Sequence, residues 1–329
     1  MRSLGLSRYA LCSCAAAAML AGCGGSQPPI AAQLGTSPGM TAATHAQASA
    51  DSWTLSGSSG ELIYAVGGCG GTCVLSYPNG QFIGALPTGG SAICSDSQGN
   101  VFISYESDVV EYAHGGTTPF ATLSLPGYQP DGCSVDPTTN NLAVVFRSTG
   151  GDVAVFPNEE GPPTLYTSGV DSFHCGYDNA GNLFVDGFTD KDGPQPALSE
   201  LPRNGGAFEL LTISSDIGEP GQVQWDGKRM TYQVADTGEI KRLRISGSTV
   251  TVSGTTSLRR VSRRGGGASW IYGDSVIVPF PLHGAANKTI GIWKYPKGGR
   301  ATNFIKRFGE YKAGDMHFQA VTISVAPSR

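Results

Sequence analysis

The chain has little charge for its length. Only 15% of its 329 residues are Asp, Glu, Lys or Arg, whereas an average globular protein has about 25%. A low charge content combined with 40% hydrophobic residues excludes a charge-driven disordered chain. It also excludes a long coiled coil, which needs abundant Glu, Lys and Leu. A globular fold remains.

Glycine is the residue type in excess. The chain has 47 glycines, about twice the average share, but they do not recur at every third position as collagen requires. This composition favours a turn-rich, mostly β protein. The length suits one large domain or two ordinary ones.

The N-terminus carries an export pattern. Arg2 and Arg8 precede an apolar stretch over 9–22, which is too short for the roughly 20 residues that span a bilayer. Residues 20–23, Leu-Ala-Gly-Cys, complete the pattern. Residues 1–22 resemble a bacterial lipoprotein signal peptide, which implies cleavage before Cys23, acylation of Cys23 and a membrane anchor. The alternative is an ordinary secretory signal with a chance cysteine.

The resemblance also predicts location. Gly24 follows the cysteine, where an aspartate often signals retention in the inner membrane, so by analogy the outer membrane is favoured in the cell envelope. Residues 23–60 are rich in Gly, Ser, Ala, Thr, Gln and Pro, and we interpret them as a flexible tether behind the lipidated cysteine.

From residue 61 the chain repeats. Asp96, Asp136, Asp178 and Asp226 recur at intervals of 40, 42 and 48 residues, each between a short apolar segment and an alternating segment. Asp and Gly-Asn supply turn hydrogen bonds and positive φ angles, so each repeat predicts a hairpin. A third strand follows each hairpin, in six copies over 74–78, 109–113, 152–156, 197–201, 239–243 and 291–295. Fourth strands follow, as at 82–86, 119–123 and 208–212.

These repeats predict the fold. Six units of about 44 residues match the blade length of β-propellers. We therefore predict an all-β, six-bladed propeller over 61–326, with four-stranded antiparallel blades. The repeat region begins with the second strand of a blade and ends with the innermost strand of a blade. Pairing of these two strands would complete one blade and close the ring. The alternative is a ring of seven blades in which one repeat is degenerate.

The Asp-x-x-Gly-Asn pattern of residues 96–100 and 178–182 resembles NHL repeats and the wider group of gluconolactonase-like propellers. The motif specifies a hairpin and no reaction. The enzymes of that group imply a divalent metal at the mouth of the central channel, but no motif here carries their ligands. We predict no cofactor, and a divalent metal belongs only to an enzymatic alternative.

Five cysteines remain after signal removal and acylation. Cys69 and Cys73 flank a glycine-rich turn, which predicts a disulfide; free thiols or a redox or metal role are the alternatives. Cys94, Cys133 and Cys175 precede the hairpin aspartates. Their repetition at one strand position predicts buried free thiols that serve packing.

Carboxylates and histidines near the inner strands are the other candidates for a site. They could ring one channel mouth and bind a ligand, or they could be solvated loop residues: Asp131, Asp171, His174, Glu219, Asp315 and His317. No Gly-x-Ser-x-Gly elbow is present. The sequence therefore specifies no catalytic constellation.

Charge is distributed unevenly. Residues 51–227 contain 21 acidic and three basic residues, whereas residues 228–329 contain 17 basic and five acidic ones. In a closed ring this makes one arc acidic and the other basic. The densest basic part, with Arg259, Arg260, Arg263 and Arg264, predicts binding of an anionic glycan, a glycolipid or a protein partner, or merely a solubilising surface. Nucleic acid is not expected, because no recognition module is present.

Taken together, these patterns predict a lipid-anchored envelope propeller that binds or scaffolds an unidentified ligand without catalysis. The alternative is a metal-dependent hydrolase of the gluconolactonase type with its site at the channel mouth.

Overall fold

The computed structural model describes residues 54–146, 152–189, 195–261, 267–281, 288–311 and 318–327. Within these residues the only helical element is the three-residue 3-10 helix η1 (Pro157–Glu159). No helix in this part of the chain has the length and apolar character needed to cross a membrane. The lipidation candidate Cys23 and the candidates Arg263, Arg264, Asp315 and His317 lie outside the described residues.

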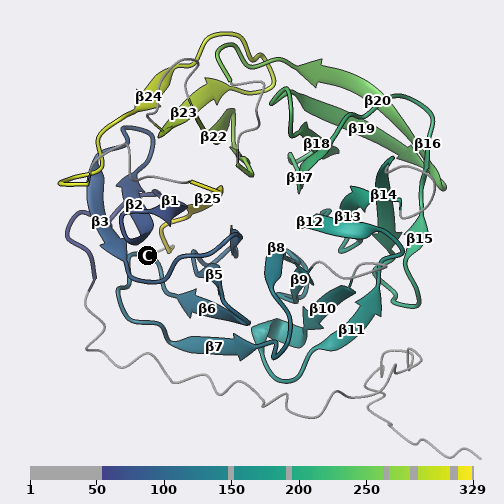
Figure 1. Cartoon of the computed structure of the whole chain (residues 1–329), viewed down its shortest axis with the longest axis horizontal. Helices are drawn as coiled ribbons and strands as arrows, with labels where there is room; N and C mark the ends of the chain where they lie inside the picture. The colour runs from purple at the N-terminus through teal and green to yellow at the C-terminus, as the bar shows by residue number, and fades with distance from the viewer. Residues whose placement is uncertain are drawn as a thin grey trace, which may run out of the picture.

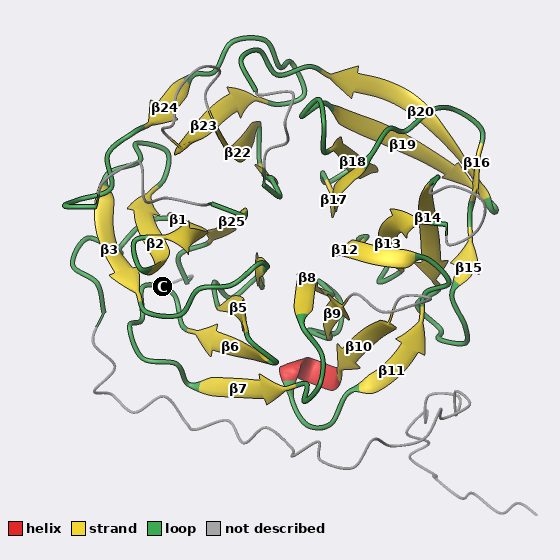
Figure 2. Ribbon diagram, viewed as in Figure 1, coloured by secondary structure: helices red, strands yellow, loops and turns green. Residues whose placement is uncertain are grey.

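Six sheets surround a common centre (Figures 1 and 2). Blade 1 consists of β25 (Ala320–Ser324), β1 (Leu62–Gly68), β2 (Gly71–Ser76) and β3 (Phe82–Leu86). Blade 2 consists of β4 (Ile93–Ser95), β5 (Val101–Tyr105), β6 (Asp108–Tyr112) and β7 (Ala121–Ser124). Blade 3 consists of β8 (Pro130–Val135), β9 (Leu142–Phe146), β10 (Asp152–Phe156) and β11 (Thr164–Thr167).

The second half of the ring follows the same order from the inner to the outer strand. Blade 4 consists of β12 (Asp171–Tyr177), β13 (Leu183–Phe188), β14 (Pro196–Leu201) and β15 (Glu209–Leu210). Blade 5 consists of β17 (Pro220–Trp225), β18 (Met230–Val234), β19 (Ile240–Ser246) and β20 (Thr249–Thr256). Blade 6 consists of β21 (Trp270–Tyr272), β22 (Ser275–Pro281), β23 (Lys288–Lys294) and β24 (Asn303–Ile305). The predicted all-β, six-bladed propeller is confirmed.

One predicted fourth strand differs from expectation. Residues 208–212 do not form a single strand, because β15 pairs with β14 in blade 4 while β16 (Thr212–Ile213) pairs in parallel with β20 of blade 5. Leu211, between the two, is buried in the core of blade 5. Burial of this side chain redirects the chain from one blade to the next.

The ring closes through the chain ends, as predicted. β25 pairs antiparallel with β1, from Leu62 opposite Ser324 to Val66 opposite Ala320. This pairing gives the second strand of blade 1 an inner neighbour and removes a free sheet edge. Residues 54–60 lie against blade 2, where the Leu55 amide donates to the Gly115 carbonyl at 2.8 Å.

The repeated aspartates make the predicted turns. Asp96 Oδ1 accepts the amides of Gln98 and Asn100, and Oδ2 accepts the side-chain amide of Asn100 at 2.8 Å. Gly99 in this turn has φ +91°, a conformation that glycine adopts readily. Asp178 and Asn182 repeat the pattern.

The predicted disulfide between Cys69 and Cys73 is present. The prediction of three free thiols is wrong, because Cys94 and Cys133 form a second disulfide that links blades 2 and 3, and only Cys175 is a buried free thiol. Cys133 and Cys175 lie three residues before their turn aspartates, but Cys94 lies two before Asp96. A shift of one residue turns a strand side chain to the opposite face. Cys94 therefore faces Cys133 of the next blade.

Candidate functional site

The predicted channel-mouth residues lie at the beginnings of inner strands. Asp131 is in β8, Asp171 and His174 are in β12, and Glu219 directly precedes β17. Figure 1 shows these three strands around the centre of the ring. The hairpin turns lie at the opposite ends of the same strands. The candidates therefore share one face of the ring, and their role in binding remains a prediction.

His174 has a partner that the sequence reading missed. Its Nδ1 lies 3.4 Å from Oδ1 of Asp186 on β13, and its backbone amide donates to the same oxygen at 2.7 Å. Asp186 is completely buried, and the register of β12 shifts between Ser172 and His174. Asp186 thus fixes an irregular inner strand. In the sequence, Asp186 is visible only as one carboxylate within the apolar run 183–188, and nothing there indicates its contact with His174.

Among the described residues, no group of three or more His, Cys, Asp and Glu side chains has the arrangement to hold a metal ion.

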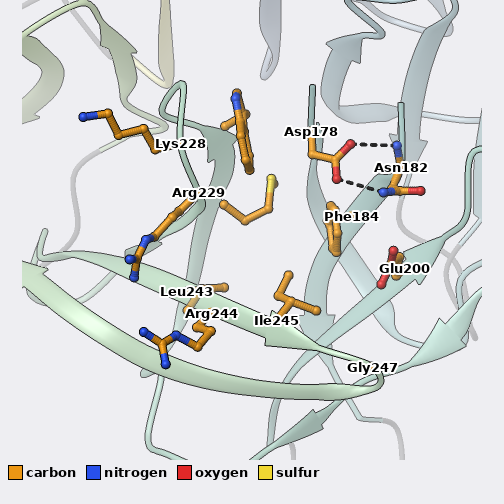
Figure 3. Close-up of a pocket in the computed structure, with 12 residues that line it drawn as sticks. Asp178, Asn182, Phe184, Glu200, Lys228, Arg229, Leu243, Arg244, Ile245 and Gly247 are labelled. Atoms are coloured by element: carbon orange, nitrogen blue, oxygen red, sulfur yellow. Dashed lines mark hydrogen bonds between the residues drawn. The ribbon is translucent and has the colours of Figure 1, made fainter. Parts of the chain in front are cut away.

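A cavity of about 520 Å³ lies between blades 4 and 5, on the side of the hairpin turns (Figure 3). We call it the blade 4–5 groove. Its volume is in the range of small-molecule sites. Its apolar lining comes from both blades and consists of Phe184, Trp225, Met230, Leu243 and Ile245. The groove lies on the opposite side of the ring from the predicted channel-mouth residues.

The two blades bring opposite charges to the edges of the groove. Blade 4 contributes Asp178 and Glu200, and blade 5 contributes Lys228, Arg229 and Arg244. Arg229 and Arg244 alternate with the apolar lining, so their side chains point to the other face of the sheet. Figure 3 shows the two carboxylates on one side and the three cations on the other. The boundary between acidic and basic sequence, after residue 227, therefore runs through this groove.

Glu200 is the more available of the two carboxyl groups. The oxygens of Asp178 already accept hydrogen bonds from Ala180 and Asn182 within their own turn. Glu200 is half-buried, and burial raises its pKa, with further contributions from the charges of Asp178 and Glu209. A cation beside Glu200 would favour its ionised form.

The strand register explains why this groove is open. The inner hairpin closes at Arg229 in blade 5 and at Ser275 in blade 6. Counted from there, Leu243 and Trp293 are equivalent residues of the third strands, and so are Ile245 and Tyr295, two residues further on. Tyr295 is buried. Its hydroxyl donates to Asp226 Oδ2 of blade 5 at 2.6 Å and thereby fills the gap between blades 5 and 6.

Ile245 occupies the same position in blade 5 and is a smaller side chain. It therefore leaves the gap between blades 4 and 5 unfilled. Tyr77 is the equivalent residue of blade 1, since Leu75 pairs with Ile63. It contacts Tyr272 of blade 6 edge-on, with ring centroids 5.5 Å apart.

A second cavity, of about 450 Å³, contains two of the predicted anion-binding residues. Arg259 and Arg260 line it together with Arg300, Ala301 and Phe304. The Arg259 amide donates to the Gly299 carbonyl at 2.8 Å, which brings the two segments together. Sequence reasoning missed Arg300 because it lies 40 residues away from Arg260. We call this cavity the arginine pocket.

Comparisons with known proteins show the fold alone. No family model matches the chain, and no curated protein matches it. A protein of unknown function from Bacteroides caccae is 10% identical, with a TM-score of 0.59 over 81% of this chain and 99% of that one. A chain in a nidogen/laminin complex is 11% identical, with a TM-score of 0.59 over 82% of this chain and 99% of that one.

Proposed function

We propose that this chain is a lipid-anchored propeller of the bacterial cell envelope that binds a ligand without catalysing a reaction. The blade 4–5 groove carries the proposal. It combines an apolar floor, which two blades contribute, with the half-buried carboxyl group of Glu200, which is the usual make-up of a binding site.

The groove can be tested with 1-anilinonaphthalene-8-sulfonate, an aromatic dye that suits an apolar floor. We expect saturable fluorescence enhancement that Ile245→Ser weakens about tenfold, since each buried apolar side chain contributes on the order of 1.5–3 kcal/mol. Leu210→Ser is the matched control, because Leu210 is 53% exposed and does not line the groove. Equal weakening by both variants, or none by either, would reject the groove as the site.

The lipid anchor rests on residues 20–23 and the preceding apolar stretch. Mass spectrometry of the protein purified from bacterial membranes should show an acylated N-terminal Cys23. Cys23→Ser should leave an unprocessed, unacylated precursor. An unmodified cysteine at the mature N-terminus would reject the anchor.

The arginine pocket supports a second binding function, the capture of an anionic glycolipid. Arg259, Arg260 and Arg300 supply guanidinium groups, which bind phosphate and carboxylate in a bidentate manner. We expect salt-sensitive binding to vesicles that contain lipopolysaccharide. Changing all three arginines to glutamine should weaken it, whereas Lys294→Gln, an exposed cation outside the pocket, should not. Equal binding by the triple variant would reject this function.

The metal-dependent hydrolase alternative remains a prediction of the sequence. It requires a stoichiometric divalent ion, so elemental analysis of the purified protein separates it from the binding function. One bound ion per chain, together with chelator-sensitive lactone hydrolysis, would replace our proposal.

A further inference from the structure

We infer that the blade 4–5 groove binds an apolar primary amine, with the ammonium group at Glu200 and the apolar body against Phe184, Leu243 and Ile245. This inference rests on the proposed binding function and adds the chemical class of the ligand. The proposed function depends on the apolar floor, whereas the class of ligand depends on the carboxyl group of Glu200.

The strand register places Glu200 on the face of blade 4 that blade 5 covers. Glu200 of β14 pairs with Phe184 of β13, and side chains that lie directly opposite each other project from the same face of a sheet. Leu198, two residues before Glu200 in β14, lies on that face as well. Phe184 and Leu198 belong to the same buried cluster as Leu243 of blade 5. The carboxyl group of Glu200 therefore lines the groove, beside Phe184 (Figure 3).

The side chain of Glu200 can accept hydrogen bonds from a ligand. None of the described residues donates a hydrogen bond to it, although it is half-buried. The charges that act on it are those of Asp178 and Glu209, which are both negative. A partly buried carboxylate beside like charges is stabilised by a cation that also donates hydrogen bonds. A primary ammonium group does both, because it carries three donors.

The described basic residues of blade 5 do not supply this cation. Arg229 Nη1 donates to Ser253 Oγ at 2.5 Å, on the face of blade 5 that points away from the groove floor. Arg244 lies on that same face. Lys228 is exposed in the turn between β17 and β18. A ligand can therefore bring the positive charge that Glu200 lacks.

The remaining lining determines the other part of the ligand. The groove has a volume of about 520 Å³, and its apolar floor includes the aromatic side chains of Phe184 and Trp225. A small inorganic cation would leave this apolar surface in contact with water, and an uncharged apolar ligand would bury the carboxyl group without a partner. A molecule with an ammonium group at one end of an apolar body satisfies both parts of the groove.

Isothermal titration calorimetry with phenylbutylamine tests the inference. We compare it with phenylbutanol and phenylbutanoate, which have the same apolar body and a neutral or a negative end. The amine should bind about tenfold more tightly than the alcohol, because only the amine forms a charge-assisted hydrogen bond with Glu200. The carboxylate should bind more weakly than either. Glu200→Gln should abolish the preference for the amine without weakening dye binding, whereas Ile245→Ser should weaken the binding of every ligand.

A matched control separates the role of Glu200 from that of net charge. Glu106→Gln removes an exposed carboxyl group outside the groove and should keep the preference for the amine. Equal affinities of the amine and the alcohol, or a preference for the amine that survives Glu200→Gln, would overturn the ammonium inference. The proposed function would then stand if the dye still binds in an Ile245-dependent manner. Failure of the dye and of all three ligands to bind would overturn both.

Discussion

Two neighbouring joints of the ring, meaning the interfaces between adjacent blades, differ although they have the same strand order. Between blades 5 and 6, Tyr295 fills the gap and donates to Asp226. Between blades 4 and 5, the equivalent residue is the smaller Ile245, and a cavity of about 520 Å³ remains. The comparison indicates that the size of one side chain at a fixed strand position contributes to whether a joint is packed or can admit a ligand.

The joint between blades 2 and 3 is a third variant of the same arrangement. Glu111 has the register position of Glu200, since both pair with the phenylalanine of the second strand, Phe102 or Phe184. Here the joint is closed and cross-linked by Cys94 and Cys133. Glu111 is completely buried. The glutamate at this register position is thus completely buried between blades 2 and 3, but only half-buried between blades 4 and 5.

The largest effect on stability should come from the cross-linked joint. Replacing Cys94 and Cys133 by alanine should lower the free energy of unfolding by about 4 kcal/mol, because the disulfide closes a loop of roughly 40 residues. The Cys69–Cys73 pair closes a much shorter loop, so its removal should cost about 2 kcal/mol. Denaturant titration measures both values. Equal losses would contradict the role of loop length.

The packed joint should depend on its tyrosine more than the open joint depends on the equivalent isoleucine. Tyr295→Ala should lower the free energy of unfolding by about 3 kcal/mol, as expected for a buried aromatic side chain. Ile245→Ala should lower it by only about 1 kcal/mol, because Ile245 is partly buried beside a cavity. The same titration compares them. A cost at Ile245 similar to that at Tyr295 would break the distinction between the two joints.

The buried acidic position should make stability depend on pH. Burial, followed by the charge of Glu159, raises the pKa of Glu111 from 4.5 to about 9. The folded state therefore keeps a proton that the unfolded state releases above pH 4.5. The resulting stabilisation is complete below that pH and falls by up to about 1.4 kcal/mol per pH unit as the pH rises toward 9.

Glu111→Gln should remove this contribution and flatten the pH dependence of unfolding. Glu106→Gln, which changes an exposed residue of the same blade, should leave the slope as it is. Denaturant titrations at several pH values between 5 and 9 would show the difference. Parallel curves for wild type and Glu111→Gln would contradict an uncharged Glu111.

The smallest expected change in stability comes from converting the open joint into a packed one. Ile245→Tyr introduces the residue that closes the joint between blades 5 and 6. We expect nearly unchanged stability, because Ile245 is only partly buried, and a loss of dye binding of about tenfold, which corresponds to about 1.4 kcal/mol. Ile245→Val changes the same position without filling the space. If both variants bind the dye equally, closure is not what the tyrosine does.

Local chemistry made most of the fold predictable. Asp96 and Asp178 revealed the blades because their turns depend on neighbours within four residues. The redox state of Cys94 was misjudged because a one-residue offset against Cys133 changes the face of a strand, and the sequence pattern concealed that offset. The change of charge after residue 227 was visible in the sequence. The groove itself was not, because Phe184 and Leu243 come together only when two blades pack side by side.

A crystal structure of the protein soaked with 1-anilinonaphthalene-8-sulfonate tests the central claim most directly. Our account predicts density for the dye in the blade 4–5 groove, against Phe184, Leu243 and Ile245. An empty groove at a saturating dye concentration, or dye bound only elsewhere on the ring, would contradict it.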